Sequence, residues 1–160
     1  LHDALPILSS LNALNVAVEA ATRKRDAARQ VLQDMQRVAQ AGQAQLEQLS
    51  GYAQETQGRW GMREGGTVQP EVMYHHYQFI GKLEHAIGLQ SGVVQDQARR
   101  VEQARQALLQ AELRLTSLRK VVERKQHELA IAQMRREQKQ TDERASLRLA
   151  VANRGMGPQE

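Results

Sequence analysis

The sequence lacks cysteine entirely and has few aromatic residues: one tryptophan, one phenylalanine and three tyrosines in 160 residues. Without cysteine the chain can form neither disulfides nor thiolate-ligated metal sites. So few bulky aromatic side chains are unusual for the core of a globular domain. No run approaches 18 consecutive apolar residues and no signal-peptide pattern opens the chain. We therefore expect a cytoplasmic protein with no membrane span.

Alanine, glutamate, lysine, leucine, arginine and glutamine dominate the composition, which is typical of long helices and coiled coils. The net charge of +4 is unevenly distributed. Residues 119–148 carry nine lysines and arginines against five acidic residues, and the rest of the chain is neutral on balance. A basic C-terminal helix is suited to an acidic protein surface, anionic lipid or nucleic acid.

Residues 1–7 resemble the translation of a common sequencing adapter fused in frame, the alternative being a genuine N-terminal arm. We exclude this segment from the fold argument and place the natural start near Leu8 or Ser9.

A heptad pattern follows from Leu11 and predicts a first helix over residues 8–60. Its two sets of seam positions, where a partner helix packs, are Leu11, Val18, Arg25, Leu32, Ala39, Leu46, Ala53 and Trp60, and Leu14, Ala21, Ala28, Met35, Gly42, Leu49 and Thr56. Arg25 and Gly42 are the main interruptions in this seam.

Clustered glycines at 61, 65 and 66, followed by Pro70, predict a turn over residues 61–70. A second helix is expected over residues 71–150, and residues 151–160, with two glycines and one proline, are expected to be disordered. The seam positions of the second helix are Met73, Ile80, Ile87, Val94, Val101, Leu108, Leu115, Val122 and Leu129, with His76, Leu83, Gln90, Gln97, Ala104, Ala111, Leu118, Lys125 and Ala132.

The expected fold is all-α: a long antiparallel two-helix coiled-coil hairpin whose second helix is longer and overhangs beyond about Val122. Lys125, Arg136 and Lys139 occupy seam positions there, so the apolar seam fades. An unpaired, charged helix is only marginally stable alone, and we therefore expect a partner on the overhang.

Catalytic and ligand-binding patterns are missing. The glycines at 61–66 lack the Gly-Lys-Ser/Thr ending of a phosphate-binding loop. His75, His76 and His85 lack the spacing that gathers metal ligands on one helix face. Glu84 and Glu128 lie far apart on a rod without a cleft. We expect no enzyme activity, no metal and no cofactor.

Three stretches resemble the FliJ family of flagellar export proteins: residues 46–52 (Leu-Glu-Gln-Leu-Ser-Gly-Tyr), 77–87 (Tyr-Gln-Phe-Ile-Gly-Lys-Leu-Glu-His-Ala-Ile) and 135–143 (Arg-Arg-Glu-Gln-Lys-Gln-Thr-Asp-Glu). The resemblance covers roughly residues 8–150. It implies a non-enzymatic component of the bacterial type III export apparatus, peripherally associated with the inner membrane at the flagellar base. The implied partners are the export ATPase hexamer, the cytoplasmic domain of the export-gate membrane protein and export chaperones.

The family's gate-contact pattern falls on eight positions of this sequence: Gln45, Leu49, Tyr52, Thr56, Phe79, Leu83, Ala86 and Gln90. Thr56 and Gln90 depart from the pattern, losing an aromatic ring and a ring nitrogen. Leu49 and Leu83 are also seam positions, so they can hold the hairpin together instead. Tyr52 and Phe79 lie beside the seam, where partial exposure suits a binding anchor.

For the ATPase ring we favour four basic residues in the overhang, Arg135, Arg136, Lys139 and Arg144, with a merely solvated charged face as the alternative. Arg23, Lys24, Arg25 and Arg29 of the first helix lie toward the same end. The competing functions are a generic coiled-coil adaptor or tether, a basic-helix nucleic-acid binder, and a membrane-surface helix. Against nucleic-acid binding, the basic C-terminal helix lacks interleaved aromatic residues. Against membrane binding, the overhang lacks a bulky apolar stripe.

Overall fold

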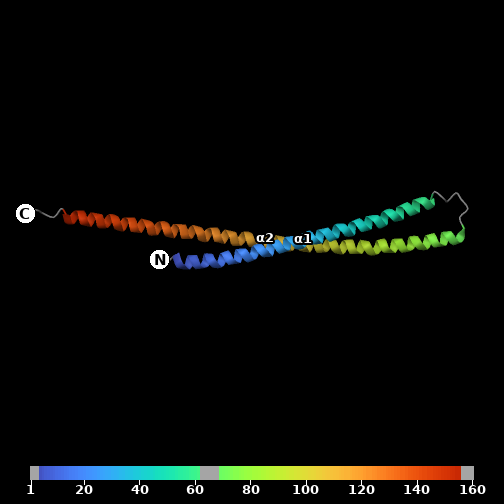
Figure 1. Ribbon diagram of the computed structural model, residues 1–160, viewed down its shortest axis with the longest axis horizontal. Coiled ribbons are helices and arrows are strands. Elements are labelled where there is room, and N and C mark those ends of the chain that lie inside the picture. The colour runs from blue at the N-terminus through green and yellow to red at the C-terminus, as the bar shows by residue number, and fades with distance from the viewer. Residues whose placement is uncertain (1–3, 62–68, 156–160) are drawn as a thin grey trace, which may run out of the picture. The chain divides into compact units, whose positions relative to one another are not determined.

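The computed structural model describes residues 4–61 and 69–155, and all of these except Gln69 are helical (Figure 1). Helix α1 spans Ala4–Gly61 and helix α2 spans Pro70–Gly155. The chain divides into two compact units. Unit 1 joins Leu1–Lys24 with Glu112–Glu160, and unit 2 is Arg25–Ala111. Within each unit a segment of α1 packs against a segment of α2, which confirms the all-α two-helix hairpin.

The core is the seam between the helices, and every seam position predicted up to Ala132 is buried or half-buried. Leu115 is the extreme case, with 2% of its surface exposed. A strip only two residues wide suffices because heptad spacing returns each apolar side chain to the facing helix. The most deeply buried apolar residues all belong to this set: Leu11, Ala21, Ala53, Ile80, Leu83, Ala104, Ala111 and Leu115.

The start of α2 follows the rules that the sequence suggested. Pro70 is the first helical residue, where its missing N–H costs no hydrogen bond. The carbonyl of Gln69 accepts hydrogen bonds from the N–H groups of Val72 (3.1 Å) and Met73 (3.2 Å). Gln69 therefore occupies the cap position of the helix. Of the expected turn, Gly61 still belongs to α1, and residues 62–68 lie outside the described residues.

Two helix ends differ from expectation. Helix α1 begins at Ala4 rather than at residue 8, since Pro6 falls in the first turn, where proline is tolerated. Residues 151–155, expected to be disordered, continue α2 to Gly155. No glycine or proline interrupts residues 151–154, so nothing in the local sequence ends the helix earlier. Residues 156–160 lie outside the described part.

The overhang begins later than predicted, after Ala132 instead of near Val122. The reason is the longer α1: Ala4, Leu5 and Leu8 lie beside Leu129 and Ala132 and extend the paired region. From Gln133 to Gly155 every residue is exposed. We call residues 133–155 the exposed segment.

Helix α1, near the N-terminus of the chain, contains an 18-residue window that is apolar enough to cross a membrane by length and composition. The sequence-based expectation of no span rested on uninterrupted apolar runs, whereas this window tolerates polar residues. A single candidate of this kind is weak support for a span, because core helices and signal sequences satisfy the same criterion.

Candidate functional site

An aromatic pair crosses the hairpin in unit 2. Tyr52 of α1 and Phe79 of α2 meet edge to face, with ring centroids 5.9 Å apart and an interplanar angle of 88°. Each residue directly precedes a buried seam residue, Ala53 and Ile80 respectively, and so projects from the flank of the seam. Tyr52 is 51% exposed and Phe79 41% exposed. Both rings therefore keep apolar surface available to a partner, as their heptad positions predict.

Four of the other predicted gate residues are buried or half-buried. Leu83 is buried, and Leu49, Ala86 and Gln90 are half-buried. The Gln90 side-chain amide donates a 2.9 Å hydrogen bond to the carbonyl of Gly42 on α1. Their burial leaves these four side chains less free surface than Tyr52 and Phe79 have.

Thr56 and Gln45 complete the predicted set. The Thr56 hydroxyl donates to the carbonyl of Tyr52 at 2.8 Å, an interaction internal to α1, and the residue is half-buried. Gln45 is exposed on the same helix. Three of the eight predicted residues have exposed side chains: Gln45, Tyr52 and Phe79. We call these three, two aromatic rings and one amide, the aromatic surface.

More aromatic residues gather near the start of α2 than the gate pattern included. The Trp60 and His76 rings stack with centroids 4.0 Å apart, packing the two helices together close to the end of α1. Tyr74 and Tyr77 are exposed. The heptad pattern identifies Trp60 and His76 as seam residues but contains no signal that their rings stack.

A groove of about 500 Å³ in unit 1 lies where the paired part of α2 gives way to the exposed segment. We call it the basic groove. Three of the four residues predicted for the ATPase ring line it, and the fourth, Arg144, is exposed further along α2. The apolar wall comes from both helices and the basic rim from α2. The lining residues are Ala4, Leu5, Leu8, Leu129, Ala132, Gln133, Arg135, Arg136 and Lys139.

The exposed segment is basic. It carries six lysines and arginines against three acidic residues. Among the described residues, none of the ion pairs involves Arg135, Arg136, Lys139 or Arg144. Because these cations are exposed and have no acidic partner there, an incoming acidic surface displaces only water and salt ions.

The described residues include no group of three or more His, Asp or Glu side chains that could hold a metal ion. Nor is any polar or charged residue among them fully buried. The described surface offers aromatic rings in unit 2 and cations beside an apolar wall in unit 1. Both features are common in interfaces with other macromolecules.

Comparison with known proteins agrees with this chemistry. A family model described as Flagellar FliJ protein matches residues 10–154. No curated protein and no solved structure gives a significant match. The family match covers nearly all of both helices, including the aromatic surface and most of the exposed segment. The chain therefore belongs to the FliJ family, whose members are components of the flagellar export apparatus.

Proposed function

We propose that this chain is a non-enzymatic coupling component of the flagellar export apparatus, which joins the export ATPase ring to the export gate and handles export chaperones. The observation that carries the proposal is the exposed segment: α2 continues from Gln133 to Gly155, beyond its last half-buried seam position, with every residue exposed. A long, basic helix without a partner is the part of the molecule best suited to entering another assembly.

The basic groove supports binding to the ATPase ring. Its three cations stand beside an apolar wall that includes Leu8 and Leu129, which lie outside the segment that resembles an adapter. An acidic surface with one apolar side chain would meet both features at once. Complementary charge of this kind raises the association rate and fixes orientation more than it raises affinity. Arg144 extends the same positive field along α2.

The aromatic surface supports binding to the cytoplasmic domain of the gate protein. Aromatic rings are favoured interface anchors because they bury much apolar area in well-packed pockets. In this assignment Tyr52 and Phe79 make the contact and Gln45 adds a polar group. The remaining residues of the predicted set are buried or half-buried, and we assign them to supporting the hairpin that presents the rings: Leu49, Thr56, Leu83, Ala86 and Gln90.

The proposed location is the cytoplasmic face of the inner membrane at the flagellar base, reached through the gate protein. A generic coiled-coil tether would share the hairpin but would bind neither the ATPase nor the gate. A nucleic-acid binder would show affinity that falls steeply with salt and does not depend on the aromatic surface.

The test is a pair of binding titrations with the purified export ATPase and the purified gate domain. We expect the Arg135→Glu, Arg136→Glu, Lys139→Glu triple variant to lose ATPase binding at least tenfold and to keep gate binding. Phe79→Ala should show the reverse pattern.

Matched controls separate the sites from general effects. Arg114→Glu, Arg119→Glu, Lys120→Glu changes the net charge equally at exposed positions outside the groove. Tyr77→Ala removes an exposed ring near Phe79. Both controls should bind like wild type. If the wild-type protein binds neither partner at micromolar concentration, the proposal is contradicted and the generic coiled-coil tether is the better interpretation.

A further inference from the structure

Gly42 is the one glycine in the predicted seam of α1, and it is buried. A Cβ atom built at this position would overlap the side-chain amide of Gln97 on α2. The helical glycines at 51, 58, 81, 88 and 92 differ, because a Cβ there would meet no atom within 4 Å. Of these six glycines, Gly42 is the one at which a side chain of the facing helix occupies the place where a Cβ atom would lie.

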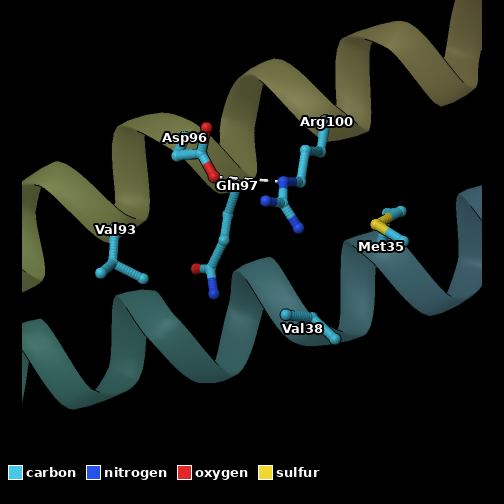
Figure 2. Close-up of a pocket in the computed structure, with 6 residues that line it drawn as sticks. All are labelled: Met35, Val38, Val93, Asp96, Gln97 and Arg100. Carbon is cyan, nitrogen blue, oxygen red and sulfur yellow. Dashed lines mark ion pairs between the residues drawn. The ribbon is translucent and has the colours of Figure 1, made fainter.

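Two glutamines one heptad apart on α2 use this space. The Gln90 amide donates to the Gly42 carbonyl at 2.9 Å, which glycine leaves unshielded. Gln97 extends from α2 toward α1, as Figure 2 shows, beside the Asp96–Arg100 ion pair (3.1 Å). A groove of about 340 Å³ adjoins it, lined by Met35, Val38, Val93, Asp96, Gln97 and Arg100.

This layer is costly for stability. The Gln97 carbonyl oxygen is buried and has no hydrogen-bond partner among the described residues. A buried acceptor without a partner destabilises the fold, and leucine at either glutamine position would bury more apolar area. Polar residues at seam positions of coiled coils select register and partner at the expense of stability.

Other pairings lose what this one provides. Sliding α1 by one heptad would place Met35 or Leu49 where Gly42 now faces Gln90, and their side chains would cover the backbone carbonyl. In a parallel, in-register pair of chains Gly42 would face its own copy and leave a void. In the observed register, in contrast, Gly42 faces Gln90 and Gln97 of the same chain.

We propose that Gly42, Gln90 and Gln97 form a polar layer that selects the intrachain hairpin and its register over slipped pairings and over pairing between copies of the chain. Gly42 supplies the space and the acceptor, and Gln90 supplies the donor. Gln97 fills the space beside Gly42. Its amide also makes the seam less apolar at this point, which disfavours alternative registers of the two helices.

The test measures register by cross-linking in a chain without native cysteine. Tyr52→Cys with Phe79→Cys reports the observed register, and Tyr52→Cys with Val72→Cys or Ala86→Cys reports a heptad slip. Mixing ¹⁴N- and ¹⁵N-labelled chains separates links within a chain from links between chains. Light scattering gives the mass, which is 18.0 kDa for one chain.

We expect the polar layer to give one register and a monomer. Gln90→Leu/Gln97→Leu should raise the melting temperature yet produce slipped cross-links or dimers, and adding Gly42→Leu should enhance this. Gln95→Leu/Gln103→Leu, which adds equal apolar surface at exposed positions, should behave like wild type. A dimeric wild type, a single register in both leucine variants, or equal slippage in the control would overturn the proposal.

Discussion

Two parts of one helix behave differently. In residues 70–132 of α2 a buried or half-buried residue recurs every three or four positions, whereas in residues 133–155 every residue is exposed. Both parts are helical and rich in residues that favour helix. They differ in the seam, which is mainly apolar up to Ala132 and then continues through Arg136 and Lys139. Residues 133–155 also lie past the point where the first turns of α1 meet Leu129 and Ala132. Helix propensity therefore does not distinguish the two parts, whereas seam chemistry and the position of α1 do.

The largest expected effect compares one leucine from each part. Leu115→Ala should lower the free energy of unfolding by about 2–4 kcal/mol, because it leaves a cavity at the most buried position. Leu147→Ala, at a residue 65% exposed, should change it by less than about 0.5 kcal/mol. Urea denaturation followed by circular dichroism measures both. Equal losses would show that residue 147 is also packed.

A smaller effect is expected at the aromatic surface. Phe79→Ala should lower the free energy of unfolding by about 1 kcal/mol, since it removes the edge-to-face contact with Tyr52 and the covered part of the ring. Tyr77→Ala should cost less, because Tyr77 is more exposed. The same denaturation experiment applies, and a larger loss at Tyr77 would contradict the assignment of Phe79 to the seam flank.

Replacing helical glycines in residues 70–132 or in α1 should raise the free energy of unfolding by no more than the change expected for Phe79→Ala. Gly88→Ala should raise the free energy of unfolding by up to about 1 kcal/mol through helix propensity, since its Cβ would meet open space. Gly42→Ala should raise it less, because the Gln97 amide must move. Thermal melts of the two variants measured side by side test this prediction. A larger stabilisation by Gly42→Ala than by Gly88→Ala would contradict it.

The smallest effect on stability is expected from removing the exposed segment. A chain ending at Ala132 should keep its melting temperature nearly unchanged, because no buried or half-buried seam residue is lost. Its helical signal should fall in proportion to the share of α2 that is removed. A large drop in melting temperature would mean that residues 133–155 stabilise the hairpin after all.

The heptad pattern predicted the seam correctly, since each predicted position up to Ala132 is at least half-buried. It also placed Tyr52 and Phe79 beside the seam. Helix ends were less accurate: α1 began at Ala4, within the segment left out as adapter-like, and residues 151–155 continued α2. The overhang was consequently placed too early, near Val122.

Contacts between specific side chains were beyond the heptad pattern. The Gln90 amide reaches the Gly42 carbonyl only in one register of two helices, and seam spacing does not determine which register forms. The Trp60–His76 stack depends on side-chain rotation, which spacing does not determine either. The basic groove arises because the early start of α1 brings its first turns beside Leu129.

Hydrogen–deuterium exchange of the full chain, with and without the export ATPase, tests the central claim most directly. We predict slow exchange at residues 70–132 and fast exchange at 133–155 in the free chain, with the exposed segment gaining protection when the ATPase is added. Exchange at 133–155 that is already slow in the free chain, or that the ATPase leaves unchanged, would contradict the account.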